Sequence, residues 1–277
     1  MGKNTRFYLK SQDIVTGLGE IGLPIFKILS KSTPVIGYDI NPKLANNKNN
    51  KKFQLLETKI LHICIPFTNK FLQNVSQLNQ KFRPKIIVIH STISPGTTKK
   101  IQNSTKIPII YSATRGVHKR MIFDLKRYTK FFAIEKTHPK NRWAATEFSK
   151  LMNKCGIITK QMSTPLTLEL AKIVVDTSYY GWLINYAQIS NIIAKKHNVN
   201  YDEMWSFSDE IHKTLGNRPK LFPGFIGGHC VIPNLELIDE KQLWEIDKIN
   251  NLYAKKVKDV KSINKKHEKS KKQSYNV

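Results

Sequence analysis

The sequence predicts an α/β fold in which a doubly wound parallel sheet is followed by a mostly α-helical domain. Three observations support this prediction. Short apolar runs alternate with helical stretches through the first half of the chain. A glycine-rich turn joins the first of these runs to the first helix. Beyond about residue 165 the strand pattern stops, and long stretches with helical spacing follow.

The strands are predicted from short apolar runs that end at turn residues. These runs lie at 13–16, 34–39, 60–65, 85–90, 107–111 and 131–134. They are apolar without clean alternation, which is typical of parallel strands covered on both faces. Residues 21–29 have helical spacing, and Pro24 is tolerated in the first turn of that helix. The alternation of strands and helices therefore predicts βαβ units.

The second half of the chain predicts helices and one long loop. Residues 166–197 contain no proline and only Gly181, so they predict one long helix that must pack against something or against a copy of itself. Residues 201–215 predict a further helix, 216–233 a loop, and 235 to about 266 a final helix. We expect an N-terminal domain at 1–160, a helical domain at 161–254 and a lysine-rich tail at 255–277.

Composition limits the classes of protein to which this chain can belong. The chain has 277 residues, of which 40% are hydrophobic, as in a globular protein with a sizeable core. It has no apolar run long enough to span a bilayer and no apolar segment of a secretory signal at its start, so we expect no membrane partner. The three cysteines argue against a disulfide framework and for a reducing compartment, the cytoplasm.

The formal net charge of +26 has two interpretations. Lysines cluster in the tail, and the others are spread along the chain beside asparagine and isoleucine, as expected of a solvated, compositional bias. The alternative is a polyanion-binding role, for example toward nucleic acid. We expect the first, and we note that positive charge also favours a phosphorylated substrate.

The glycine-rich turn is Gly17-Leu18-Gly19-Glu20-Ile21-Gly22. It follows a strand and opens a helix, which is the arrangement of a Rossmann-type dinucleotide site. The helix N-terminus offers backbone N–H groups and positive dipole charge to a pyrophosphate. Asp39 ends the second strand, where a carboxylate binds the adenosine ribose and repels a 2′-phosphate. We therefore predict NAD bound by Gly17, Gly19, Ile21, Gly22 and Asp39, and no metal.

The loop at 223–230 presents Cys230 among Gly224, Gly227 and Gly228, which remove side-chain bulk around the thiol. A cysteine that is only structural more often sits on a strand or helix, as Cys64 does in this sequence. Cys230 is therefore a candidate nucleophile. His229 is a candidate base, although neighbouring side chains often point apart, and an incidental loop thiol is the alternative.

The chain resembles the UDP-glucose/GDP-mannose dehydrogenase family of nucleotide-sugar 6-dehydrogenases. Its Gly-Gly-His-Cys motif is most similar to the branch that acts on UDP-N-acetyl-hexosamines such as UDP-N-acetylmannosamine. The segments that carry the resemblance keep the family's order and are 17–22, Asp39, 63–66, 91–97, 169–172 and 223–230.

The resemblance implies a Rossmann domain, two NAD per turnover and oxidation of a sugar C6 alcohol to the carboxylate in polysaccharide biosynthesis. It implies that Cys230 forms a thiohemiacetal and then a thioester, that Lys172 stabilises the oxyanion, and that Thr92 lies beside the nicotinamide or a bound water. The substrate would lie against Phe222, Gly224 and Gly227. The helix at 166–197 would form a homodimer.

Three polar positions depart from the family. Asp176 stands where the family has asparagine, and Asn234 stands where it has an aspartate used in acid–base chemistry. Residues 113–115 replace a Pro-Glu pair. Because an amide cannot take up a proton, Asn234 cannot be that base. Either Asp176 supplies the missing carboxylate, or the base is lost.

The family also has a C-terminal domain that holds the nucleotide, and no such domain follows in this sequence. The expectation is a separate nucleotide-binding subunit, a smaller substrate, or a catalytically impaired relative that acts as an NAD-binding scaffold or polyanion-binding protein. A related alternative is a two-electron β-hydroxyacid dehydrogenase, which also uses a lysine on the long helix but does not need Cys230.

Overall fold

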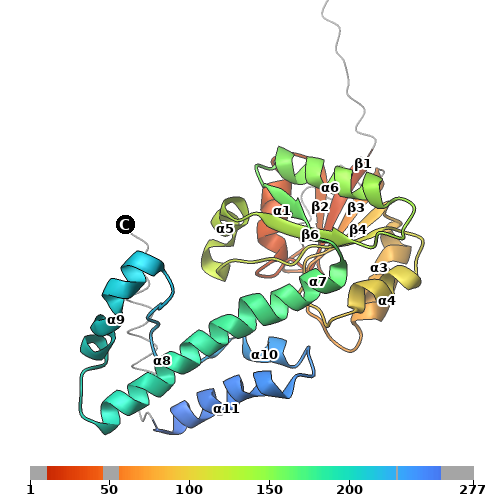
Figure 1. Cartoon of the computed structure of the whole chain (residues 1–277). Coiled ribbons are helices and arrows are strands. Elements are labelled where there is room, and N and C mark those ends of the chain that lie inside the picture. The colour runs from red at the N-terminus through yellow and green to blue at the C-terminus, as the bar shows by residue number, and fades with distance from the viewer. Residues whose placement is uncertain (1–10, 46–55, 229, 257–277) are drawn as a thin grey trace, which may run out of the picture. The chain divides into compact units, whose positions relative to one another are not determined.

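The computed structural model describes residues 11–45, 56–228 and 230–256 (Figure 1). The chain divides into two compact units, residues 1–172 and 173–277. The predicted tail lies almost entirely at 257–277, outside the described residues, as does His229.

A seven-stranded sheet forms the centre of the first unit, with strand order β2-β1-β3-β4-β5-β6-β7. The strands are β1 Ser11–Thr16, β2 Val35–Tyr38, β3 Glu57–Ile63, β4 Ile86–Ile89, β5 Ile109–Tyr111, β6 Lys130–Ile134 and β7 Thr159–Gln161. β1 pairs in parallel with both β2 and β3, so successive strands are added on opposite sides of β1. In doubly wound sheets a ligand binds at such a switch point, beyond the carboxyl ends of the strands.

Two features of the sheet differ from the prediction. β6 is antiparallel to β5, whereas a parallel sheet was expected. The apolar run could not reveal this, because a strand buried on both faces has the same pattern in either direction. β7 was not predicted because its sequence, Thr-Lys-Gln, is polar.

Helices cover both faces of the sheet, which confirms the doubly wound arrangement (Figure 1). One apolar cluster joins one face to α1 Gly22–Leu29, α5 Met121–Arg127 and α6 Asn141–Lys154. Another cluster joins the other face to α3 Phe71–Phe82, α4 Thr97–Asn103 and α7 Pro165–Leu170. A short 3-10 helix, η1 His118–Arg120, leads into α5.

The predicted long helix is present. The chain is helical from α7 through a π-helical segment, η2 Ala171–Ser178, to α8 Tyr179–Lys196. π-helical segments are rare and occur frequently at functional sites. The division between the two units falls within η2. Among the described helices, none combines the length and apolar character that crossing a membrane requires.

The second unit is helical. Helix α9 Tyr201–Leu215 has the predicted bounds, and the Asn200 side chain caps it by accepting from the N–H groups of Asp202 and Glu203. The unit continues with the loop before the short helix α10 Ile232–Leu235 and with α11 Lys241–Lys256. The final helix was predicted to begin at residue 235. It begins at Lys241 because Leu237 and Ile238 donate to carbonyls only three residues back, which closes turns instead of a helix.

A small core joins the loop to the helices of this unit. It contains Ile226, Val231, Leu235 and Ile246, all buried. Gly181 of α8 allows this packing, because a Cβ there would lie 2.8 Å from Cγ1 of Val231. The glycine in the long helix is therefore a point of close approach.

Candidate active site

The glycine turn follows β1, and at two of its glycines a side chain would clash with the protein's own backbone. Gly17 has φ +80°, and a Cβ on it would lie 2.8 Å from the Cys64 carbonyl oxygen. A Cβ on Gly22 would lie 1.7 Å from the Gly17 carbonyl oxygen. These two glycines let the turn close against the end of β3 and begin α1.

Gly19 differs from its two neighbours in the motif. A Cβ built on Gly19 would have no atom within 4 Å beyond those of Gly19 and its two chain neighbours, among the residues that the structure describes. Packing therefore does not explain the absence of a side chain there. Open space beside a backbone that leads into a helix N-terminus is suited to the approach of an anionic group. Ile21 immediately precedes α1 and is half-buried.

Asp39, just after β2, is bonded to the turn. Its Oδ2 accepts a 2.7 Å hydrogen bond from the backbone N–H of Leu18, and Oδ1 accepts one of 2.8 Å from the N–H of Asn41. The carboxylate is thus oriented at the carboxyl end of the sheet beside the glycine turn. The structure thus brings Asp39 to the turn that contains Gly17, Gly19 and Gly22, and their binding of NAD stays a prediction.

Thr92 and Lys172 also belong to the first unit, and both are half-buried. Thr92 lies in the loop between β4 and α4. The buried carboxylate of Glu169 connects α7 to that loop's end: it accepts from the N–H of Gly96, the N–H of Thr98 at 2.9 Å and the Thr98 hydroxyl at 2.6 Å. Glu169 therefore caps α4 and fixes the helix turn that leads to Lys172. The sequence analysis did not predict this role, although a glutamate among the apolar residues of a predicted helix could have indicated a buried carboxylate.

A buried polar cluster lies within the sheet and near the end of β3. The imidazoles of His62 and His90 are 3.0 Å apart, between Nδ1 of His62 and Nε2 of His90. The Lys130 ammonium donates to the Ser112 carbonyl at 3.1 Å. Burial lowers the pKa of Lys130 to about 7 and that of His62 to about 3, and it raises the pKa of the Cys64 thiol to about 12. At neutral pH the Cys64 thiol is therefore protonated and a poor nucleophile.

Cys230 lies in the second unit and is exposed. The side-chain amide of Asn234, in α10, donates to the backbone carbonyl of Cys230, so this residue holds the loop in place. Asp176 is half-buried in η2. Of the predicted substrate residues, Phe222 is half-buried, Gly224 is buried and Gly227 is exposed.

A buried amide network, which was not predicted, holds the start of the cysteine loop. Gln188 of α8 donates to the Gly224 carbonyl at 2.7 Å and to Oδ1 of Asn250 at 3.0 Å. Asn250 of α11 also accepts from the Ile226 N–H at 2.8 Å and donates to the Ile226 carbonyl at 3.1 Å. The Tyr253 hydroxyl donates to the Pro223 carbonyl. The signal was present in the sequence, as amides three residues apart at Asn185, Gln188 and Asn191.

Comparison with known proteins gives matches among solved structures. No protein-family model and no curated protein matches the sequence. A UDP-D-ManNAc dehydrogenase from Pyrococcus horikoshii is 20% identical with a TM-score of 0.70, over 87% of this chain and 68% of that one. The UDP-N-acetyl-mannosamine dehydrogenase of Staphylococcus aureus is 18% identical with a TM-score of 0.62, over 88% and 68%.

Two further matches are also dehydrogenases by name. An NDP-N-acetyl-D-galactosaminuronic acid dehydrogenase from Methanosarcina mazei is 14% identical with a TM-score of 0.64, over 90% of this chain and 67% of that one. A 3-hydroxyisobutyrate dehydrogenase from Mycobacterium tuberculosis is 13% identical with a TM-score of 0.59, over 91% and 95%. The chain therefore has the fold of these dehydrogenases, a Rossmann-like α/β sheet followed by helices.

Proposed function

We propose that this protein is an oxidoreductase that binds NAD at the glycine turn and oxidises the C6 alcohol of a nucleotide sugar. The observation that carries the proposal is the open position at Gly19 beside the oriented carboxylate of Asp39. The names of the P. horikoshii, S. aureus and M. mazei proteins support a nucleotide-sugar substrate. UDP-N-acetylmannosamine is the first substrate to test.

The residues present fit a nicotinamide dinucleotide. The turn at 17–22 offers backbone N–H groups and the N-terminus of α1 to the pyrophosphate. The Asp39 carboxylate offers acceptors to ribose hydroxyls and repels a 2′-phosphate, so we propose NAD in preference to NADP. When bound, the nicotinamide accepts a hydride.

The proposed chemistry assigns a role to each predicted residue. With NAD bound as the hydride acceptor, a base would take the hydroxyl proton of the C6 alcohol as the alcohol is oxidised to an aldehyde. The Cys230 thiolate adds to the aldehyde carbon, Lys172 stabilises the oxyanion, and protonation gives a thiohemiacetal. With a second NAD bound as the acceptor, the base would take the hydroxyl proton as the thiohemiacetal is oxidised to a thioester. Water then adds to the thioester carbon and gives one proton to the base, the C–S bond breaks, and the carboxylate and the Cys230 thiolate are released while the second proton passes to solvent.

The base and the positioning groups are also proposals. We assign the carboxylate function to Asp176, since the amide of Asn234 cannot take up a proton. Asn234 instead positions Cys230 through its backbone carbonyl. Thr92 is proposed to lie beside the nicotinamide, and Phe222, Gly224 and Gly227 beside the substrate.

A second candidate is supported by the M. tuberculosis protein, of which this chain covers 95%. A two-electron oxidation of a β-hydroxyacid would use the same dinucleotide turn and Lys172, and it would not need a thiol. Cys230 therefore separates the two candidates.

The test is NADH formation with NAD and a panel of UDP- and GDP-sugars and β-hydroxyacids, on wild type, Cys230→Ser and Cys155→Ala. Cys155 is buried in the first unit, away from the proposed chemistry, and serves as the matched thiol control. Two NADH per sugar, lost in Cys230→Ser alone, supports the four-electron reaction. One NADH per hydroxyacid, unchanged in Cys230→Ser, supports the second candidate. NAD binding without turnover on any substrate contradicts both and leaves a dinucleotide-binding scaffold.

We also propose that the protein forms a homodimer through the long helix. Exposed apolar side chains along it include Val175 at 69%, Tyr179 at 57%, Tyr186 at 62% and Ile193 at 49%. A series of exposed large apolar side chains along one helix is a candidate interaction site. Tyr186→Glu/Ile193→Glu is expected to give a monomer in analytical ultracentrifugation. Ile158→Glu, at an exposed apolar residue of the first unit, is the control. A separate nucleotide-binding subunit is a further proposed partner, tested by adding such a protein to the activity assay.

A further inference from the structure

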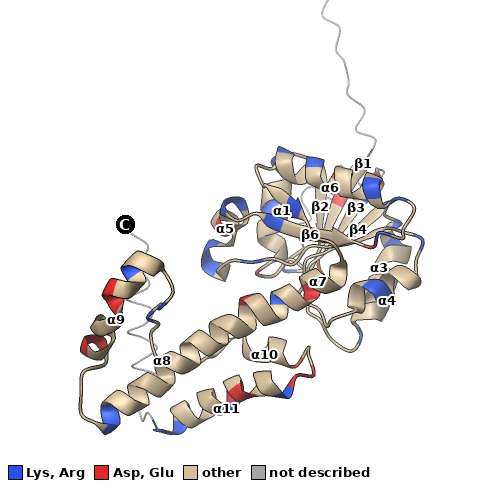
Figure 2. Ribbon diagram, viewed as in Figure 1, with Lys and Arg blue, Asp and Glu red and all other residues tan. Residues whose placement is uncertain are grey.

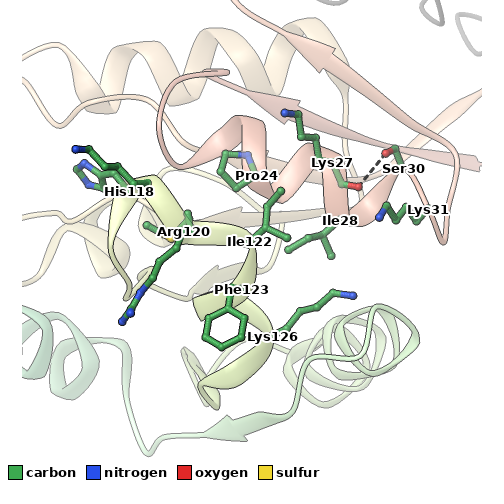
Figure 3. Close-up of a pocket in the computed structure, with 12 residues that line it drawn as sticks. Pro24, Lys27, Ile28, Ser30, Lys31, His118, Arg120, Ile122, Phe123 and Lys126 are labelled. Carbon is green, nitrogen blue, oxygen red and sulfur yellow. Dashed lines mark hydrogen bonds between the residues drawn. The ribbon is translucent and has the colours of Figure 1, made fainter. Parts of the chain in front are cut away.

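A groove of about 850 Å³ lies between α1 and α5 in the first unit (Figure 3). Apolar side chains contribute to it from both helices: Pro24, Ile28, Met121, Ile122 and Phe123. The other residues that line it are polar or cationic: Lys27, Ser30, Lys31, His118, Lys119, Arg120 and Lys126. None of them belongs to the proposed dinucleotide site, so the groove requires a separate explanation.

The positive charge of the groove is largely uncompensated. Two of its basic residues are paired with carboxylates: Arg120 with Asp124 at 3.0 Å, and His118 with Glu20 at 2.7 Å. Within the described part of the chain, no salt bridge involves the exposed lysines Lys27, Lys31, Lys119 or Lys126. Figure 2 shows these helices carrying basic residues in blue. Four like charges around one groove attract a polyanion.

Two exposed aromatic rings belong to this region: Phe123 lines the groove, and Tyr128 directly follows α5 without lining it. The Phe123 side chain is 58% exposed and that of Tyr128 is 38% exposed. The Arg127 guanidinium lies 5.9 Å from the Phe123 ring centroid and 5.8 Å from that of Tyr128. The Arg127 cation thus lies beside both rings. Cations for phosphates beside rings for bases are the features of a single-stranded nucleic-acid site.

We propose that this groove binds single-stranded nucleic acid, with the four lysines on phosphates and with Phe123, which lines the groove, stacked under a base. An acidic protein segment would also be attracted by the lysines, but it would gain nothing specific from the rings. Because nucleic-acid bases stack on aromatic rings whatever their sequence, we expect little sequence preference.

The first test is fluorescence anisotropy of a labelled oligothymidylate of about twelve nucleotides with the full chain. Lys119→Glu/Lys126→Glu is compared with Lys99→Glu/Lys100→Glu, which makes the same charge change on α4, packed on the other face of the sheet. The groove variant is expected to bind at least about tenfold more weakly than the α4 variant, with a salt dependence reduced by about two phosphate contacts. Equal losses in the two variants would assign binding to diffuse charge and overturn the proposal, as would no binding by the wild type at low salt.

The second test examines the rings. Phe123→Ala keeps every charge and is expected to weaken binding about fivefold or more, because one base loses its stacking partner. Unchanged affinity in this variant would contradict the site. Polyglutamate of matched length serves as a competitor, and displacement of the oligonucleotide at equal concentration would indicate an acidic protein segment instead. Weak displacement by polyglutamate, together with the loss in Phe123→Ala, supports nucleic acid.

Discussion

The Asp39 carboxylate and the Leu18 backbone N–H are joined by a 2.7 Å hydrogen bond, so the end of β2 and the glycine turn after β1 form one structural element. This bond fixes where a negative charge stands beside the turn. Because an asparagine side chain at this position would keep one acceptor oxygen for the Leu18 N–H, the charge can be removed while only the bond from the Asn41 N–H is lost.

Asp39→Asn is therefore expected to change cofactor choice more than turn structure. Loss of the carboxylate removes repulsion of a 2′-phosphate, so the affinity ratio of NADP to NAD should rise about tenfold. Titration of NADH and NADPH fluorescence measures both affinities. An equal change in the two affinities would show that the charge of Asp39 does not select the cofactor.

Alanine substitutions at Gly19 and Gly22 are expected to have different effects, the first on NAD affinity and the second on the free energy of unfolding. Gly22→Ala places a Cβ against the Gly17 carbonyl and should lower the free energy of unfolding by roughly 1–3 kcal/mol. Gly19→Ala meets no protein atom among the described residues and should leave it within about 0.5 kcal/mol, while NAD affinity falls about tenfold. Urea unfolding and NADH titration on both variants check this, and unaltered affinity in Gly19→Ala would contradict the proposed pyrophosphate site.

Asp13 should give the stability a distinctive pH dependence. Burial raises the pKa of this carboxyl to about 7, although it accepts a hydrogen bond from the Ile60 N–H. Between about pH 4 and 7 the folded chain then keeps a proton that the unfolded chain has lost. The contribution of Asp13 to the free energy of unfolding therefore falls as pH rises through this range.

Asp13→Asn should remove that slope, which urea unfolding at several pH values measures against wild type. Asp239→Asn, at an exposed carboxyl, is the control and should leave the slope unchanged. Identical slopes in wild type and Asp13→Asn would mean that Asp13 titrates normally.

The amide network predicts a sharp difference between two adjacent asparagines. Asn250→Ala leaves the Ile226 N–H and the Gln188 amide without their acceptor, so it should cost at least about 2 kcal/mol. Asn251 is exposed, and its side chain donates to the neighbouring Asp247 carboxylate on the helix surface, so Asn251→Ala should be nearly neutral. Urea unfolding checks both, and a similar cost in the two variants would disprove a specific role for the network.

The three thiols should differ in reactivity. Cys230 is exposed, whereas burial raises the pKa values of Cys64 and Cys155. Ellman's reagent at neutral pH is therefore expected to label one equivalent quickly in the native protein. This fast phase should vanish in Cys230→Ser, and a second fast equivalent would contradict the inertness of Cys64.

Apolar pattern predicted the centre of the fold well. The central strands β4 and β5 are buried at every position, and burial on both faces selects the continuous apolar runs that the pattern identified. It could not give the direction of β6, and it missed β7, whose polar residues carry no such pattern. The start of the last helix was also wrong, since the turns after α10 arise from backbone hydrogen bonds that no side chain announces.

The same distinction applies to the candidate site, where local features could be predicted and contacts between distant residues could not. The glycine turn after β1 and the place of Asp39 beside it could be predicted, because the turn requires glycines at 17 and 22, but their role in binding NAD stays a prediction. Glu169, Gln188 and Asn250 were not assigned, since their roles depend on partners distant in sequence. The roles of Lys172, Asp176 and Cys230 in chemistry stay predictions.

The buried amide network means that the cysteine loop is a surface segment only in part. Its start is hydrogen-bonded to side chains of α8 and α11, so releasing it would break bonds inside the unit's own interior. Backbone amides such as that of Ile226 should then exchange with deuterium as slowly as those of the helices, in one cooperative opening. The loop that ends at Cys230 is thus anchored at its start, and residues 223–226 can be released only when the interior of the unit opens.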